Sequence, residues 1–425
     1  MNKELLKKII LENKELAGKI KPLLHRGRIN LPQDLKKVIL LYGVRRSGKT
    51  YILYDLFREN LKNSLYIDFE DDRICEFKLK DFDDLKEAFY ELYPDLLDKE
   101  KYFFLDEIQN VEGWEKICRR AVEKENIKVF VAGSSSKFSP EDIHTSLRGR
   151  EWSIEITPFS FKEYLDIINI PVNNEYLFGP KNTITKNLFQ KYMKWGGFPE
   201  IVLSDDEFQK NKLLREYFRA LFFRDLVERY DMANISLIGA LADKLFSSFA
   251  CRMSLNAFYK QYKDKFPFSK DSLYEYYRNF ISSMLIYEVK IFSESTYKRH
   301  RNPSKIYLPD TGLARRATSE DSGRLLENMV FLKLRKENDE VFYFSNDSEC
   351  DFVTKKDNKF SAVQVCYYMD ETNRDREIHG LAECCRHLNL KKGKILTNDQ
   401  EDNIKEKGID IRMQPVWKWL LEEAR

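Results

Sequence analysis

The octapeptide GVRRSGKT at residues 43–50 has the spacing G-x-x-x-x-G-K-[ST], which is typical of a phosphate-binding loop. It lies between a strand-like apolar run and a helical pattern, so its backbone N–H groups and the helix N-terminus can face phosphates. We expect Lys49 to neutralise the β- and γ-phosphates and Thr50 to place its hydroxyl on Mg²⁺. A chance glycine-rich turn is the alternative. The expected phosphate-binding residues are Gly43, Val44, Arg45, Arg46, Ser47, Gly48, Lys49, Thr50 and Tyr51.

A second motif, KYFFLDE at residues 101–107, places an acidic pair at the end of an apolar run. The carboxyl ends of strands in an open α/β sheet are where ligands bind. We expect Asp106 to hold Mg²⁺, usually through water, and Glu107 to orient and polarise an attacking water. An acidic surface turn is the alternative. Because the two motifs are independent, their combination predicts hydrolysis of ATP with Mg²⁺ as cofactor.

Polar residues elsewhere could complete this chemistry. The run KVFVAGSSS ends in hydroxyl residues, of which Ser134 or Ser135 could contact the γ-phosphate or the attacking water. An ordinary loop of small residues explains this run equally well. Arg148 and Arg150 could stabilise transition-state charge within the chain or from a neighbouring subunit, whereas solvated arginines are the alternative. Ser134 and Arg150 therefore join Lys49 and Glu107 as the catalytic candidates.

The elements that must position these residues follow from hydrophobic patterning. Five apolar runs of strand length alternate with helical patterns, which predicts a parallel α/β sheet buried on both faces. From residue 234 the pattern is three helices and then a strand pair around a basic loop, the order of a winged helix. Beyond residue 322 the pattern is a helix, three strands, a helix and a strand. We predict an N-terminal helix (1–30), a P-loop core (31–165), a helical lid (166–232), a winged-helix module (233–320) and a nuclease-like α/β domain (321–425).

The basic loop of the winged-helix segment is STYKRHRNPSKIY. A cluster of this kind can hold a phosphate backbone without reading sequence, so DNA is a candidate partner. A solvated hairpin or a protein-docking surface is the alternative. The basic residues in this loop are Lys298, Arg299, His300, Arg301 and Lys305, beside Tyr297.

The last segment retains two of the four catalytic residue types of a restriction-type nuclease and has other residues at the remaining two positions. Such enzymes use a helix Glu, a strand Asp and then Glu-x-Lys on the next strand to hold Mg²⁺ and activate water. Glu327 and Asp351 fit the first two seats, whereas Gln364 and Cys366 occupy the last two. A neutral amide and a soft thiol are poor partners for Mg²⁺. We therefore expect a recognition domain without nuclease activity; an ATP-regulated nuclease that uses Glu327 and Asp351 is the alternative.

Composition limits the partners and the cellular compartment that we expect for this chain. The 425 residues carry a net charge of only +3, so any affinity for nucleic acid must come from a local basic patch. The seven cysteines form no CxxC pair, and with five His they show no zinc-ligand spacing. No apolar run reaches the roughly 18 residues of a membrane span, and no signal peptide is visible. A cytoplasmic protein with reduced thiols is the expectation.

Several of these motifs together carry a resemblance to a known family. LYGVRRSGKT, FFLDEIQNVEGWE, VFVAGSSS, LRGREWSIEITPFSFKEYL and WGGFPEIVL resemble, in order and spacing, the predicted AAA-type ATPases of bacteria and archaea that carry a C-terminal domain of unknown function. The resemblance implies ATP binding and hydrolysis, with a winged helix and a restriction-endonuclease-like core in the C-terminal part. It is also compatible with an oligomer, because AAA-type relatives often form rings. A nucleotide-driven switch that acts on DNA or a protein partner is the leading hypothesis, and a non-catalytic ATP-binding scaffold is a further alternative.

Overall fold

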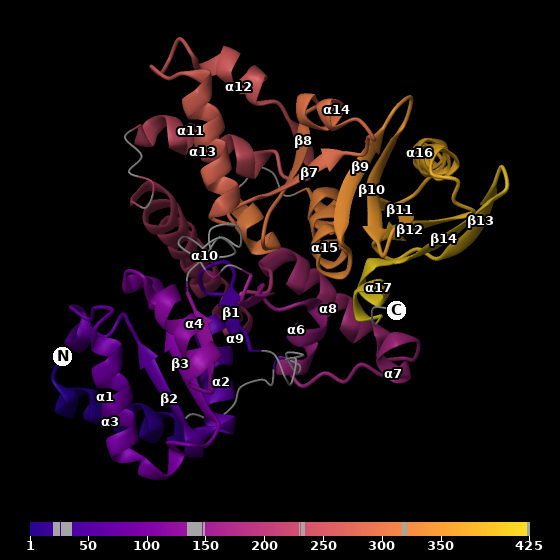
Figure 1. Cartoon of the computed structure of the whole chain (residues 1–425). Helices are drawn as coiled ribbons and strands as arrows, with labels where there is room; N and C mark the ends of the chain where they lie inside the picture. The colour runs from indigo at the N-terminus through magenta and orange to yellow at the C-terminus, as the bar shows by residue number, and fades with distance from the viewer. Residues whose placement is uncertain are drawn as a thin grey trace. The chain divides into compact units, whose positions relative to one another are not determined.

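The computed structural model describes residues 1–19, 26, 36–133, 147, 149–228, 230, 234–316 and 321–422. The chain forms two compact units, Met1–Thr157 and Pro158–Arg425 (Figure 1). Both contain helices and sheets, which confirms the predicted α/β class. The structure divides into two compact units only, so the predicted division into an N-terminal helix, a P-loop core, a helical lid, a winged-helix module and a nuclease-like domain stays a prediction.

The first unit is built on a five-stranded sheet with the strand order β2-β3-β4-β1-β5. Every neighbouring pair in it is parallel, as predicted. The strands are β1 (Val38–Tyr42), β2 (Ser64–Asp68), β3 (Lys101–Asp106), β4 (Ile127–Ala132) and β5 (Glu151–Glu155). The helices are α1 (Lys3–Lys19), α2 (Lys49–Glu59), α3 (Asp81–Leu92) and α4 (Trp114–Lys124), with short 3₁₀ turns at Leu61–Asn63, Asp72–Ile74, Pro94–Leu96 and Ile108–Asn110.

Both faces of this sheet are buried because alternate strand residues enter two different cores. Leu40 and Leu105 belong to the core that α1, α3 and α4 cover. Leu41 and Phe104 belong to the core on the side of α2. The strands therefore lie between two helical layers, and the carboxyl ends of the central strands remain for a ligand.

The second unit begins with helices that the WGGFPE motif interrupts. The helix α8 ends at Trp195, and the Asp310 carboxylate accepts a 2.7 Å hydrogen bond from the Gly197 N–H that follows. A Cβ on Gly196, whose φ is +77°, would lie 1.8 Å from the same carboxylate, so the motif requires glycine there. The helices of this region are α6 (Phe161–Ile167), α7 (Asn174–Leu177), α8 (Asn182–Trp195), α9 (Pro199–Leu203), α10 (Glu207–Phe222), a π-helical turn (Phe223–Glu228), α11 (Ile235–Ser247), α12 (Leu255–Tyr262) and α13 (Lys270–Ser282).

A mixed nine-stranded sheet organises the rest of the second unit, in the order β13-β14-β12-β11-β10-β9-β7-β8-β6 (Figure 1). The strands are β6 (Cys251–Met253), β7 (Tyr287–Ile291), β8 (Ser304–Tyr307), β9 (Glu340–Ser345), β10 (Glu349–Lys356), β11 (Lys359–Cys366), β12 (Lys392–Thr397), β13 (Asp402–Glu406) and β14 (Ile409–Pro415). The helices around it are α14 (Thr296–Arg301), a 3₁₀ turn (Thr311–Arg316), α15 (Ser322–Glu337), α16 (Arg374–His387) and α17 (Val416–Leu421). The last two strands and α17 were not predicted.

One strand pair in this sheet joins segments that the sequence suggests are separate modules. The predicted strand pair around the basic loop is β7 and β8, which pair antiparallel. β7 also pairs in parallel with β9, so the sheet continues from the predicted winged-helix segment into the predicted nuclease-like segment. This long-range pairing brings residues of β8 to the start of β10.

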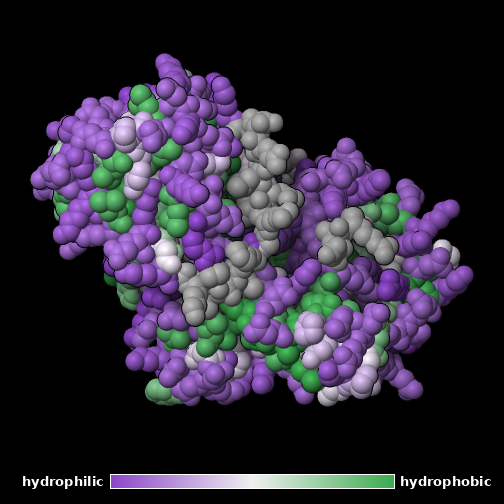
Figure 2. Space-filling model, turned by 90° about the horizontal axis from the view of Figure 1, so that it is seen from below, coloured by the Kyte–Doolittle hydropathy of each residue, from purple (hydrophilic) through white to green (hydrophobic). Residues whose placement is uncertain are grey.

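The surface is predominantly hydrophilic on the face that Figure 2 displays, and hydrophobic residues lie between hydrophilic ones. Among the described ranges of the chain, no helix is both long and apolar enough to cross a membrane.

Candidate functional sites

Two glycines shape the loop between β1 and α2. Gly43 has a φ of +148°, and a Cβ there would lie 2.1 Å from the Ile156 carbonyl oxygen. Ile156 is fixed at this place because its N–H donates to the Tyr42 carbonyl at 2.7 Å. Gly48, with a φ of +95°, is the N-cap of α2. These glycines allow the loop to turn sharply after β1. The N-terminus of α2 then faces the space that the loop encloses.

Lys49 lies across this loop. Its ammonium donates to the carbonyl oxygens of Gly43 and Val44, both at 3.0 Å, and its side chain is buried. Ser47 is fully buried, and its hydroxyl has no hydrogen-bond partner among the residues described. A buried ammonium and an unsatisfied hydroxyl in a glycine-shaped loop fit a phosphate group.

The two sequence motifs meet at Thr50 and Asp106. The Thr50 hydroxyl in the first turn of α2 forms a hydrogen bond with the Asp106 carboxylate at the end of β3. Tyr66 donates to Asp106 Oδ2 at 2.9 Å. Burial, and next the charge of Glu107, raise the pKa of Asp106 to about 6. The predicted Mg²⁺ residues are thus adjacent, and a cation between Asp106 and phosphate would relieve the cost of this buried carboxylate.

Glu107 follows directly in a left-handed backbone conformation with a φ of +46°. This conformation is uncommon for a residue other than glycine and turns the chain sharply after β3. The Glu107 carboxylate accepts a hydrogen bond from the side-chain amide of Gln109. Gln109 thereby orients the side chain for which we predict the role of activating water.

Asp68 is a residue that motif reasoning missed. It ends β2 and lies beside Asp106 in the parallel register of β2 and β3. Burial raises the pKa of Asp68, and the Asp68 charge is one of the causes that raise the pKa of Asp106. A signal was available, because Asp68 follows a buried strand in the same way as Asp106 does.

A metal site made of protein groups alone is not found within the described part of the chain. A P-loop does not need one, because Mg²⁺ keeps several waters and takes further oxygens from the nucleotide phosphates. Thr50 and Asp106 have the hard oxygen atoms suited to the ion. The residues present therefore fit Mg²⁺ together with a nucleotide.

Of the remaining catalytic candidates, the structure describes only Arg150. Ser134, Ser135 and Arg148 lie outside the described residues. Arg150 precedes β5, and its carbonyl accepts from the N–H of Val38 at the start of β1. Its side chain is half-exposed and pairs with Glu123. The P-loop follows the opposite, carboxyl end of β1, so the length of this strand separates Arg150 from the loop. Stabilisation of transition-state charge on a neighbouring subunit by Arg150 stays a prediction.

In the second unit, a buried ion cluster occupies the predicted nuclease-like site. The Lys305 ammonium lies 2.8 Å from Asp351, 3.1 Å from Glu327 and 3.0 Å from Glu349. Tyr307 donates to Glu327 at 2.6 Å. The inclusion of Lys305 in an exposed basic loop was therefore wrong. β8 is an interior strand of the sheet, and the Lys305 side chain is only 4% exposed.

The changed seats of this site have structural roles. The side-chain oxygen Oε1 of Gln364 accepts from the N–H of Asp351 at 3.0 Å, and its side-chain nitrogen Nε2 donates to Glu377 at 2.5 Å. Burial raises the pKa of Cys366 to about 11, so this thiol is protonated near neutrality. Glu349 was also missed by sequence reasoning, although it precedes Asp351 by two residues and so belongs to the same face of the strand.

The other basic residues of the loop form the helix α14. Tyr297 is 70% exposed, and the Arg301 guanidinium lies over its ring at 5.9 Å. Lys298, Arg299 and Arg301 form no ion pair with any residue that the structure describes. This helix therefore presents uncompensated positive charge to solvent.

Comparisons with known protein families match the P-loop segment and the later segments of the chain to separate family models. Residues 35–165 match the model of an AAA domain, residues 186–323 a domain of unknown function (DUF8612) and residues 322–418 a second one (DUF4143). An uncharacterized protein of Methanocaldococcus jannaschii is 36% identical over 99% of this chain and 96% of the relative. An uncharacterized protein of Haemophilus influenzae is 28% identical over 81% of this chain and 86% of the relative. Among solved structures, a Walker-type ATPase of Pyrococcus abyssi aligns with a TM-score of 0.44 and 16% identity, over 74% of this chain and 95% of that one.

Proposed function

Because this chain belongs to the AAA-type P-loop ATPases with a C-terminal domain of unknown function, we propose that it binds ATP with Mg²⁺ and hydrolyses it. The observation that carries the proposal is the hydrogen bond between Thr50 of the loop helix and Asp106 of β3. It joins the phosphate-binding motif to the acidic pair in one site. Glu107 is next to this pair, where a water that attacks the γ-phosphate would need a base or an orienting group.

Each residue has a separate task in this site. Lys49 exchanges its bonds to loop carbonyls for contacts with the β- and γ-phosphates. Thr50 and Asp106 would hold Mg²⁺, and Glu107 would orient the attacking water. When bound, Mg²⁺ would supply positive charge that offsets the charge on the phosphate oxygens.

ATP turnover and nucleotide binding together test these assignments. Lys49→Ala should lower turnover about 100-fold or more and weaken ATP binding, because it removes the charge that meets the phosphates. Glu107→Gln should lower turnover by a similar factor while ATP still binds. Exposed residues of the same unit provide matched controls, Lys62→Ala and Glu112→Gln, and both should behave as wild type. Absence of Mg²⁺-dependent hydrolysis by the wild type would contradict the proposal.

We further propose that ATP turnover drives a switch whose second unit contacts DNA or a protein partner. The unpaired cations Lys298, Arg299 and Arg301 of α14 favour a phosphate backbone as one ligand. Ala at all three should weaken DNA binding for every sequence and reduce the slope of log affinity against log salt by up to about 3, at 0.9 per phosphate contact. A control with the same charge change replaces three exposed lysines elsewhere in the unit, Lys391, Lys392 and Lys405. Equal effects of the two variants would show a general charge effect instead of a site on α14.

The nuclease alternative has less support than the switch. Lys305 pairs with the carboxylates that would hold the metal, and the Gln364 side chain forms hydrogen bonds with Asp351 and Glu377. We expect DNA to stay intact with Mg²⁺ or Mn²⁺, and cleavage that Asp351→Ala abolishes would restore this alternative. Nucleotide that remains bound without turnover, together with a nucleotide-dependent change in mass, would instead favour a scaffold.

A further inference from the structure

A cavity of about 350 Å³ lies in the second unit where α16 ends over the nine-stranded sheet. Phe342 of β9 lies on the face of the sheet that α16 covers, because Phe344 of the same strand packs into the core with that helix. Phe360 of β11 belongs to the same face, since Ala362 packs into this core too. α16 ends at His387, and the cavity opens beside this end of the helix. Its volume is in the range of ligand-binding pockets.

Four aromatic rings line the cavity, and we call them the Phe292 cluster (Phe292, Phe342, Phe360 and His387). The Phe292 ring, directly after β7, has its centre 5.7 Å from that of Phe342 and 5.4 Å from that of Phe360. The centre of the His387 ring is 6.3 Å away. The three neighbouring rings stand at 75°, 78° and 86° to Phe292, so they meet it edge to face. The three Phe rings are half-buried and His387 is exposed. A flat heteroaromatic group can stack in such a cluster, because it meets ring faces as well as ring edges.

The charges that line the cavity nearly cancel. Lys355 forms a 3.1 Å ion pair with Glu340. Arg299 and Glu294 add one charge of each sign to the lining, and the remaining titratable group is His387. A neutral ring whose edge carries hydrogen-bonding groups therefore suits this cavity better than a free anion or a free cation.

Uncompensated positive charge lies beside the cavity, on α14. Arg299 connects the two features, because it lines the cavity and belongs to this helix. Lys298 and Arg301 flank it, and no described residue forms an ion pair with any of the three. Glu294 is the one carboxylate in the sequence from residue 293 to 302. A neutral aromatic cavity next to several cations matches a nucleic acid strand, whose bases are neutral and whose phosphates are anionic.

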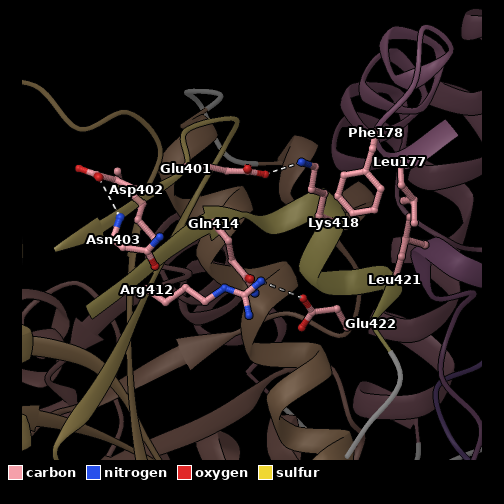
Figure 3. Close-up of a pocket in the computed structure, with 11 residues that line it drawn as sticks. Leu177, Phe178, Glu401, Asp402, Asn403, Arg412, Gln414, Lys418, Leu421 and Glu422 are labelled. Carbon is pink, nitrogen blue, oxygen red and sulfur yellow. Dashed lines mark hydrogen bonds and ion pairs between the residues drawn. The ribbon is translucent and has the colours of Figure 1, made fainter. Parts of the chain in front are cut away.

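A second cavity, on the face of β13 and β14, has a different character (Figure 3). Its two cations are engaged, because Lys418 pairs with Glu401 and Arg412 lies 3.9 Å from Glu422. Phe178 is the one aromatic side chain among the described residues that line it, and it is 67% exposed. This cavity combines neither an aromatic cluster nor free positive charge, so Phe178 provides a control.

We propose that the Phe292 cluster and α14 together bind single-stranded nucleic acid. One unpaired base enters the cavity and contacts the cluster, while the cations of α14 hold the phosphates next to it. The bases of a duplex are paired and stacked, so they cannot enter in this way. The inference rests on the proposed function in that it specifies the nucleic acid that α14 contacts. It requires neither the P-loop nor ATP.

Fluorescence polarisation with the full chain and no ATP tests the binding. The probes are a labelled strand of about twelve thymidylates, an abasic strand with the same number of phosphates, and a duplex of the same length. We expect the thymidylate strand to bind about tenfold more tightly than the abasic strand, because base stacking adds to the phosphate contacts, and more tightly than the duplex. Equal binding of the base-bearing and abasic strands, or tighter binding of the duplex, would overturn the proposal. A uridylate strand distinguishes RNA from DNA, and base-dependent affinity for either supports the proposal.

Two substitutions in the Phe292 cluster locate the base. Phe292→Leu keeps an apolar side chain of similar size, and His387→Ala changes an exposed residue, so the latter should melt within about 2 °C of wild type. Each should weaken the thymidylate strand about fivefold or more and leave the affinity for the abasic strand unchanged. Phe178→Ala, in the second cavity, should change neither affinity. Unchanged affinity for the thymidylate strand in both cluster variants, or an equal loss for the two strands, would refute the site.

A third variant separates the phosphate contacts from the base contact. Replacement of Lys298 and Arg301 by Ala, at positions outside the cavity lining, should weaken the thymidylate and abasic strands by the same factor and reduce the salt dependence of both. Loss of affinity for the thymidylate strand alone would contradict the assignment of phosphates to α14.

The remaining outcomes distinguish other occupants and the ATPase. Lys49→Ala should bind the strand as wild type does; loss of binding in this variant would place the strand at the P-loop and overturn the proposal. Thymidine monophosphate that binds as tightly as the strand would overturn it in favour of a free nucleotide, and displacement of the strand by a capped, uncharged Phe peptide would overturn it in favour of a protein segment. Absence of ATP hydrolysis with base-dependent strand binding would refute only the proposed ATPase, whereas ATP turnover without base-dependent binding would refute only this inference.

Discussion

Replacement of Lys305 by Met removes the cation of the buried cluster while it keeps a side chain of similar length. The ammonium contacts Glu327 and Asp351, which are nearly buried, and Glu349, which is more than a third exposed. Burial of Glu327, followed by the charge of Asp351, raises the pKa of Glu327 to about 7. Without Lys305 these carboxylates would face one another with no cation between them, and we expect the second unit to lose stability.

The magnitude follows from the burial of the partners. Loss of one member of a buried ion pair costs about 3–5 kcal/mol, because the remaining charge stays buried. The contact with Glu349 adds little, since exposed pairs are screened by solvent. At roughly 2–4 °C per kcal/mol for a domain of this size, the melting temperature should fall by roughly 6–20 °C.

Calorimetric melting of wild type, Lys305→Met and an exposed control, Lys298→Met, measures this change. The control should melt within about 2 °C of wild type, because exposed substitutions usually change stability by about 0.5 kcal/mol or less. Glu327→Gln added to Lys305→Met should recover part of the loss, because it removes one of the uncompensated charges. The three carboxylates of Lys305→Met also offer hard oxygen ligands, so millimolar Mg²⁺ or Mn²⁺ should raise its melting temperature and leave that of wild type unchanged.

The pH dependence of the variant gives a second measure. A carboxyl whose folded pKa is raised stabilises the fold below its unfolded pKa, and this contribution is lost as pH rises through the folded pKa. Removal of Lys305 should raise the pKa of Glu327 further, so the deficit of Lys305→Met should be smaller at pH 5 than at pH 8. A melting temperature within 2 °C of wild type at pH 8 would refute the reasoning, because the cluster would then contribute no stability.

Three further predictions concern single residues. Gly43→Ala places a Cβ 2.1 Å from the Ile156 carbonyl and should abolish detectable ATP binding in calorimetric titration, whereas the helix residue Gly18→Ala, with open space around it, should raise stability by about 0.5–1 kcal/mol. Tyr66→Phe removes a hydrogen bond that lowers the pKa of Asp106, so the acidic limb of the ATPase pH profile should move to higher pH; an unchanged profile would contradict this role. Burial raises the pKa of Asp310 to about 7, so its contribution to stability is full below about pH 4 and is lost as pH rises through 7. Asp310→Asn should lower the free energy of unfolding by about 1–3 kcal/mol at pH 5, because an amide cannot accept from two backbone N–H groups without its NH₂ facing one of them. Thermal melts of this variant at pH 5 and 8 should show a weaker pH dependence than those of wild type.

The phosphate site was predictable because its determinants are local. Residues 43–51 follow one another, and a strand before the loop and a helix after it suffice to shape the site. Asp106 could be added because strands of a parallel sheet end at one edge, and the register of β2 with β3 places Asp68 there by the same rule. Arg150 shows the limit of this reasoning, because proximity in sequence to a strand does not tell at which end of the sheet a side chain acts.

Lys305 shows what a linear reading cannot decide. In the sequence it follows four basic residues within one short segment, and that segment therefore reads as a single exposed loop. In the structure α14 holds the first four, whereas β8 carries Lys305 into the sheet and against Glu327 and Asp351.

The sequence by itself therefore determined the α/β class and the P-loop with its acidic partner strand, and it showed that Gln364 and Cys366 stand where the predicted nuclease-like site would need Glu and Lys. These properties depend on residue types at short, fixed spacings and on the period of the hydrophobic pattern. The tertiary structure alone decided that Lys305 lies among Glu327, Glu349 and Asp351, and that β7 and β9 join two predicted modules in one sheet. Each of these depends on pairing between segments distant in the chain, and such pairing is set by the packing of the whole unit rather than by any local pattern.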